Sequence, residues 1–103
     1  MLKIYDKAMW HIDGGEQKEK VLERMEVVLK FLKSHDMLND EGIEELEIGV
    51  DSSCSIHERM LTDYGRSFLD KYYDSFLVDD LDVVQQLMIR YYDEFKAFPE
   101  KNE

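Results

Sequence analysis

The chain contains one cysteine, one proline and only five glycines among its 103 residues. Because Cys54 has no partner, no internal disulfide can form, and the composition is typical of a reducing compartment such as the cytoplasm. Pro99 lies near the end of the sequence. With so few residues that interrupt regular structure, we expect long elements, and helices rather than a many-stranded sheet.

Long apolar runs and clusters of basic residues are also missing. No apolar run approaches the ~18 residues of a membrane span, and the first residues, MLKIYDKAMWHID, resemble neither a span nor a signal peptide. The pI is about 4.6, whereas a nucleic-acid-binding face needs clustered Lys and Arg. We therefore expect a cytoplasmic protein that binds neither membrane nor nucleic acid.

The sequence is nevertheless rich in residues that can form a core. Hydrophobic residues make up 44% of it and aromatic residues 12%, which excludes a chain that is disordered throughout. A chain of this length forms one domain, 1–103, and buries roughly 60–68% of its unfolded surface. The predicted fold is mainly α, a small four-helix domain with an extended or irregular N-terminal segment, 1–15, and a disordered tail, 99–103.

Four helices are predicted from apolar periodicity and capping residues. The clearest stripe consists of Val21, Met25, Val28 and Leu32, which recur at the spacing of one helix face. Asn39 and Thr62 are suitable N-caps, and Asp79 or Asp80 can cap the last helix. Ser55–Glu58 has capping-box spacing and predicts a further helical turn. The predicted helices cover 16–34, 40–48, 62–77 and 80–98.

The N-terminal segment has two interpretations. Leu2, Ile4, Ala8, Trp10 and Ile12 all occupy even positions, which favours a strand, but Ile4, Ala8 and Ile12 also fit a helix. We interpret Trp10 as a large anchor that pins this segment to the helices.

A ten-residue pattern, M-L-[NT]-D-x-G-x-x-x-L, occurs at 37–46 and again at 60–69. In each copy an apolar residue precedes the helix cap, and a glycine in the first turn lets another backbone approach closely. Two copies are too few for a solenoid, and we interpret them as reuse of one local solution.

The most informative feature is a run of carboxylates without counter-charge. Between Lys33 and Arg59 there are eight acidic residues and no Lys or Arg. These residues account for most of the net charge of -11, and their mutual repulsion costs stability. Either they dock a basic partner, or they form a solvated face that keeps the protein soluble. The candidate partner-binding residues are Asp36, Asp40, Glu41, Glu44, Glu45, Glu47 and Asp51; Glu58 completes the run.

Other chemical sites are weakly indicated. An EF-hand fails because placing Gly42 at loop position 6 puts Met37 at position 1. His11, His35 and His57 are weak metal candidates, since no two lie at a metal-binding spacing. Cys54 and His57 form C-x-x-H, but nearby carboxylates would raise the thiol pKa. We predict no cofactor, no bound metal and no catalytic residues.

Adjacent tyrosines indicate a second candidate contact. The pairs at 72–73 and 91–92 cannot both face inward on one helix, so one ring of each pair lies at the margin of the core or on the surface. Such rings either pack against their neighbours or contribute to an interface. Tyr73 and Tyr92 are the candidate residues for a homodimer contact.

The opening Tyr5–His11 resembles that of small uncharacterised bacterial proteins that begin Y-D-K-A-x-W-H. The similarity continues in L-x-x-E-G-x-E at 38–44 and S-I-H-x-x-M-L-T-x-x-G at 55–65, so it spans 5–77. The resemblance implies no activity. In size and charge alone, the chain is similar to immunity proteins of bacterial toxin systems.

The leading hypothesis is therefore a non-enzymatic, acidic protein-interaction module that binds a basic protein, as an immunity protein or a regulator would. One alternative is a small metal-dependent or His/carboxylate enzyme. The other is a dimeric structural protein.

Overall fold

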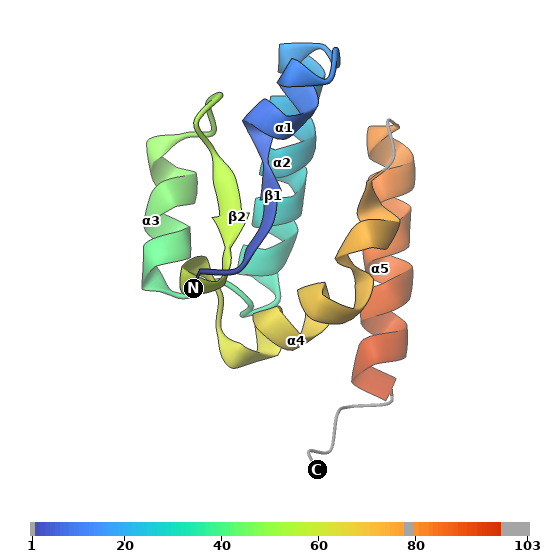
Figure 1. Ribbon diagram of the computed structural model, residues 1–103. Helices are drawn as coiled ribbons and strands as arrows, with labels where there is room; N and C mark the ends of the chain where they lie inside the picture. Colours follow the sequence, from blue (N-terminus) through green and yellow to red (C-terminus); the bar gives the residue numbers. More distant parts are fainter. Residues whose placement is uncertain (1, 78–79, 98–103) are drawn as a thin grey trace.

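The computed structural model describes residues 2–77 and 80–97 (Figure 1). The protein is mainly α, with one short two-stranded sheet, as predicted. The elements in chain order are β1 (Ile4–Lys7), α1 (Ala8–Asp13), α2 (Lys18–Ser34), α3 (Asp40–Ile48), β2 (Ser55–His57), the 3-10 turn η1 (Glu58–Met60), α4 (Asp63–Tyr72), the 3-10 turn η2 (Tyr73–Phe76) and α5 (Leu81–Ala97).

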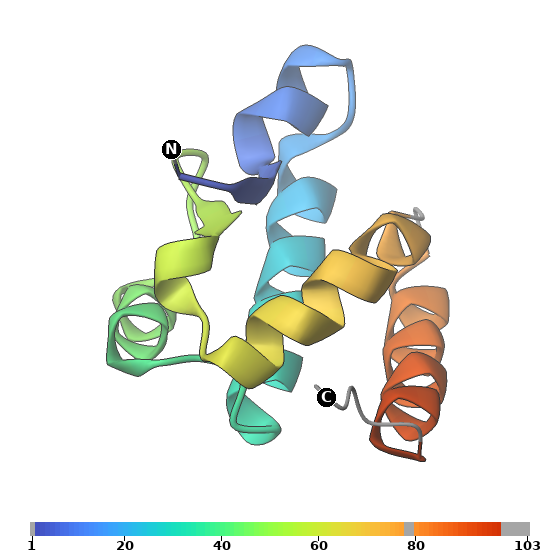
Figure 2. The ribbon, with the colours of Figure 1, turned by 60° about the horizontal axis from the view of Figure 1, so that its bottom comes forward.

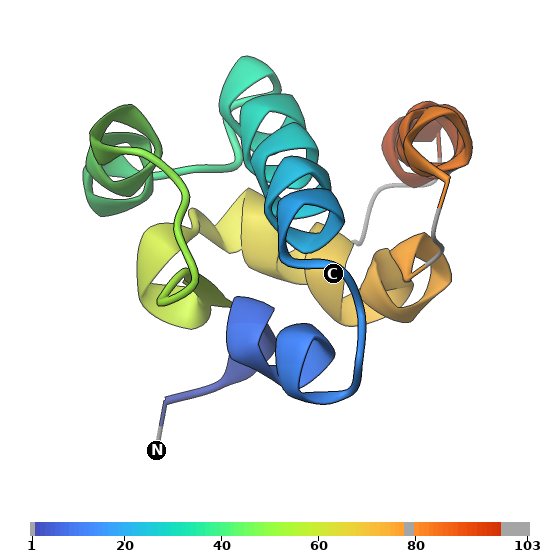
Figure 3. The same ribbon diagram turned by 90° about the horizontal axis from the view of Figure 1, so that it is seen from above.

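Three helices form one side of the molecule. In Figures 1 and 3, α2 lies between α3 and α5, while α4, α1 and the two strands pack across the other side. This arrangement follows from the apolar stripe of α2, whose residues Val21, Met25, Val28 and Leu32 are all buried. Because α2 is central, it carries the core, and α3 and α5 are edge helices with outward faces.

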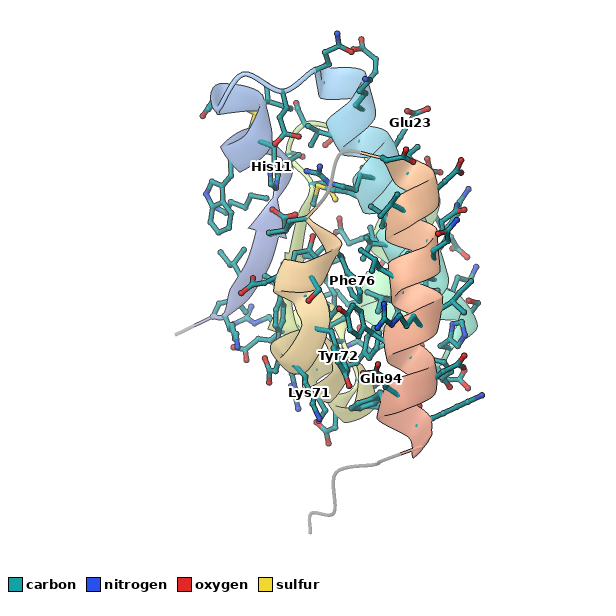
Figure 4. The ribbon with its side chains drawn as sticks, turned by 90° about the vertical axis from the view of Figure 1, so that its right-hand side faces the viewer. His11, Glu23, Lys71, Tyr72, Phe76 and Glu94 are labelled. Carbon is teal, nitrogen blue, oxygen red and sulfur yellow. The ribbon has the colours of Figure 1, made fainter. Side chains whose placement is uncertain are left out.

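Aromatic rings join α4 to α5. Phe68 and Phe76 are almost fully buried, and the ring of Tyr72 stacks on that of Tyr91 with centroids 4.8 Å apart. Figure 4 shows Tyr72 and Phe76 pointing toward α5. The predicted helix 62–77 is divided: α4 ends at Tyr72, and the chain tightens into the 3-10 turn η2, where Tyr73 and Phe76 are buried.

Both N-terminal interpretations are realised in turn, since β1 is a strand and α1 a helix. β1 pairs antiparallel with β2, with Ile4 opposite His57 and Lys7 opposite Ser55. The predicted helical turn at Ser55 is therefore wrong, because the backbone of this segment pairs with β1 as a strand. The helical turn follows at η1, where the His57 ring accepts a hydrogen bond from Arg59 N–H.

The interpretation of Trp10 as an anchor is also wrong. Its side chain is 54% exposed, and the Lys7 ammonium lies 6.0 Å from its ring centroid. The reason is the change from strand to helix at Ala8, which breaks the alternation of even positions. Ala8 is fully buried instead, and Trp10 lies on the outer side of α1.

The remaining bounds are close to prediction. The second helix, predicted over 16–34, begins at Lys18 as α2. Asp80 caps α5, because its carboxylate accepts hydrogen bonds from the N–H groups of Asp82 and Val83. Asp79, residue 98 and the predicted tail 99–103 lie outside the described residues. Within the described ranges, every helix is too short or too polar to cross a membrane.

The two copies of the repeated pattern pack on each other reciprocally at one end of the molecule (Figure 2). Leu38 and Leu61 form a β-bridge, Asn39 N–H donates to the Met60 carbonyl, and Thr62 N–H donates to the Met37 carbonyl, each at 3.0 Å. Gly42 and Gly65 lie against these same two carbonyls. The predicted close backbone approach at both glycines is thus confirmed, and each helix start supports the other.

Candidate functional site

The acidic face is built on α3. Asn39 caps this helix, since its Oδ1 accepts from Gly42 N–H at 3.0 Å. Ile43 and Leu46 are half-buried against the core, and Gly42 packs against the Met60 backbone. With these three positions facing inward, the acidic positions of the helix must face solvent.

All seven candidate partner-binding residues are exposed. Among residues 2–77 and 80–97, none of the seven forms an ion pair with a Lys or Arg. Basic residues elsewhere in the described fold pair with other carboxylates, as Lys3 does with Asp70 and Lys30 with Glu26. In the described part of the chain, the carboxylates of 36–51 therefore have no direct ion-pair partner, and the pKa of Asp51 is lowered mainly by hydrogen bonds from Ser53 and least by the positive charge of Lys18.

Four of these seven residues also have a local structural role. Asp36 adopts a left-handed backbone conformation, with φ 60°, which Asp tolerates better than most residues. Asp51 accepts from the Ser53 hydroxyl and N–H at 2.6 and 2.9 Å, and these hydrogen bonds lower the pKa of its carboxyl. Asp40 and Glu41 lie in the first turn of α3, where the helix dipole favours negative charge.

The other three carboxylates have no such role. Glu44 lies at the middle of α3, Glu45 and Glu47 lie in its last turn, and the last turn has no basic residue. Negative charge at this end of a helix opposes the dipole. Ile48, the last residue of α3, is 75% exposed beside them. The negative charge at the end of α3 lowers stability and the exposed Ile48 lowers solubility, and no ion pair in the described part of the chain offsets this charge.

The structure does not bring the three histidines together. The His11 ring lies 3.0 Å from Glu16, just before α2, whereas His35 directly follows α2. Seventeen residues of helix span roughly 25 Å. His57 lies in β2 and accepts from Arg59 N–H. Within the described ranges, no group of three His, Cys, Asp or Glu side chains could hold a metal ion.

Sequence reasoning missed a buried polar network around Asp6, which is only 2% exposed. Its carboxylate lies 2.6 Å from His11 Nε2, accepts from Tyr73 OH at 2.5 Å and accepts from Lys7 N–H at 2.9 Å. Glu16 continues the network, with one oxygen 3.0 Å from His11 Nδ1 and the other 3.3 Å from Arg24 Nη1. Figure 4 labels His11 on α1.

This network links four elements, because Asp6 lies in β1, His11 in α1, Arg24 in α2 and Tyr73 in η2. Both ring nitrogens of His11 face carboxylates, Nε2 that of Asp6 and Nδ1 that of Glu16. The five-residue spacings from Asp6 to His11 and from His11 to Glu16 correspond to no single helix or strand period. Only an alternating strand that passes directly into a helix brings these side chains into contact, which explains why periodicity did not reveal them.

Cys54 is not activated as a nucleophile. Burial, followed by the negative charge of Asp51, raises the pKa of its thiol to about 11. A thiolate is the reactive form, so little of it exists near neutral pH. The direction agrees with the effect of nearby carboxylates that the sequence indicated.

The two candidate dimer residues lie in different environments. Tyr73 is 5% exposed and donates its hydroxyl to Asp6, so it packs in the core rather than on a surface. Tyr92 is half-buried on α5, with its ring edge against His35 and its hydroxyl 3.2 Å from that of Tyr64.

Comparisons of this chain with protein-family models, curated proteins and solved structures find no match.

Proposed function

We propose that this protein is a non-enzymatic interaction module that binds a basic protein through the α3 acidic face. This face consists of Asp36, Asp40, Glu41, Glu44, Glu45, Glu47 and Asp51. The observation that carries the proposal is the exposure of all seven carboxylates together with the lack of any Lys or Arg ion pair to them in the described part of the chain.

A face that serves solubility alone explains these residues less well. Solubility needs net charge but not its concentration on one short helix, and natural surfaces usually intersperse both signs. Glu45 and Glu47 oppose the helix dipole in the last turn of α3, and Ile48 exposes apolar surface beside them. Carboxylates around an exposed apolar residue are suited to a partner that presents basic groups around an apolar contact.

Charge of this kind acts mainly on association rate and on the choice of partner. Neutralisation of a basic toxin, as by an immunity protein, and control of a basic cytoplasmic protein would both use the face in this way. The enzyme alternative is weaker, because His11, His35 and His57 have separate surroundings and His11 is held between two carboxylates.

The experiment compares two triple variants that remove the same charge. Glu44→Gln, Glu45→Gln and Glu47→Gln neutralise the acidic face. Asp13→Asn, Glu19→Gln and Glu23→Gln neutralise three exposed carboxylates on α1 and α2 and form the matched control. Each protein is used to capture partners from the cells that encode it, and the captured partner is then purified and titrated at two salt concentrations.

We expect a basic partner whose affinity falls about tenfold or more with the face variant and changes little with the control. Raising the salt from about 0.05 to 0.3 M shortens the Debye length and should weaken binding of the wild type more than of the face variant. Equal affinities for the two variants, or an affinity that is indifferent to salt, would contradict the proposal.

A further inference from the structure

A second surface lies on α5, at the opposite edge of the molecule from α3 (Figures 1 and 3). Asp82, Ile89 and Lys96 are spaced seven residues apart, so they lie along one side of the helix, two turns from each other. All three are exposed, and Ile89 is 57% exposed. The stripe thus has an acidic residue at one end, an apolar one in the middle and a basic one at the other end.

The stripe borders a groove between α2 and α5. The groove has a volume of about 430 Å³, and its apolar lining comes from Val27, Phe31, Met88 and Ile89. Lys30, Ser34 and Gln85 supply its polar rim. Isolated exposed apolar residues are ordinary on protein surfaces, but one beside an apolar groove can fill a matching groove on another molecule.

We propose that a second copy of this chain packs on the stripe, with the two α5 helices antiparallel and the two-fold axis passing beside Ile89. In such an isologous contact, a residue i of one copy meets a residue j of the other and j meets i in return, and only residues on the axis meet their own equivalents. The residue two turns before Ile89 in one copy then faces the residue two turns after Ile89 in the other copy. Asp82 of each copy therefore lies opposite Lys96 of the other, which gives two such pairs. The two Ile89 side chains meet at the centre, beside both grooves.

The distribution of charge permits this approach despite a net charge of -11 on each copy. α2 carries five basic and three acidic residues, and α5 carries two basic and three acidic residues. The excess negative charge lies instead on α3, beyond α2. Lys96 would exchange an exposed pair with Asp93, 3.7 Å long, and a position 5.5 Å from the centroid of the Tyr92 ring, and both kinds of contact are weak at exposed sites.

The dimer goes beyond the proposed function and is independent of it, because the α3 acidic face stays outside the contact. Sedimentation equilibrium over a wide range of protein concentration provides the test. We expect a monomer–dimer equilibrium whose dissociation constant rises about tenfold or more with Ile89→Glu. Ile48→Glu is the matched control, since Ile48 is also an exposed isoleucine but lies on α3, and it should leave the dimer unchanged.

Charge reversal tests the antiparallel arrangement separately. Asp82→Lys and Lys96→Asp should each weaken the dimer several-fold, because each places like charges opposite one another. The double variant should restore the dimer, a result that misfolding of a single variant would not give. A monomer at every concentration would overturn the proposal and leave the groove to a different partner. Equal effects of the two isoleucine variants, or no rescue by the double reversal, would overturn it too.

Discussion

The backbone of Gly65 lies so close to the carbonyl of Met37 that a Cβ built on the glycine would be 2.3 Å from that oxygen. Gly42 has the same relationship to Met60, at 2.4 Å. Each carbonyl also accepts an N–H from the cap residue three positions before that glycine, so neither can retreat without losing a hydrogen bond. The two helix starts are therefore locked to each other.

Gly65→Ala should destabilise the protein by about 1–3 kcal/mol, the usual cost of overpacking a tight contact. This direction is opposite to the gain of up to ~1 kcal/mol that Ala normally brings to a helix. The midpoint of urea denaturation measures the effect. Gly14→Ala is the control, because its Cβ would meet only ordinary contacts at 3.4 Å or more, and it should change the midpoint little. A more stable Gly65→Ala variant would show that the close approach is not rigid.

Tyr73→Phe should cost about 1–3 kcal/mol, because it removes one hydrogen bond from the buried carboxylate of Asp6. Tyr64→Phe removes a hydroxyl bonded to Tyr92 at a position that is 40% exposed. Water can replace that partner, so the control should lose no more than ~0.5 kcal/mol. Thermal and urea unfolding of both variants provide the comparison, and equal losses would argue against a special role for the buried network.

Stability should fall as the pH rises above about 9. The folded state raises the pKa of the Cys54 thiol from 9.0 to about 11, mainly through burial. A thiol with a raised folded pKa stabilises the fold fully below its unfolded pKa, and this contribution is lost as the pH rises toward 11. Cys54→Ala should therefore flatten the decline between pH 9 and 11, as followed by urea midpoints. An unchanged slope would assign the decline to other groups, such as Tyr73, whose pKa is also raised by burial.

Salt should stabilise this protein against urea. Repulsion among the carboxylates of the α3 acidic face destabilises the compact state, and added ions screen it. Glu44→Gln, Glu45→Gln and Glu47→Gln together should raise the urea midpoint at low salt and reduce its dependence on salt. A wild-type midpoint that falls with salt would mean that favourable ion pairs outweigh this repulsion.

Local sequence determined the helices and the exposure of the charge. The stripe from Val21 to Leu32 requires a helix with one buried face, and Asn39 and Thr62 begin helices because their side chains satisfy free N–H groups. The acidic residues of α3 could be placed outward for the same reason, since Ile43 and Leu46 define the inner side of that helix.

Only the tertiary structure decided which distant segments meet. The pairing of β1 with β2 and the contact of Asp6 with Tyr73 each depend on a partner far away along the chain. Periodicity states which side of an element is apolar, but not what that side will pack against. A buried carboxylate with three hydrogen-bonding partners exists only once the chain has closed around it, which is why the network around Asp6 could not be read from the sequence.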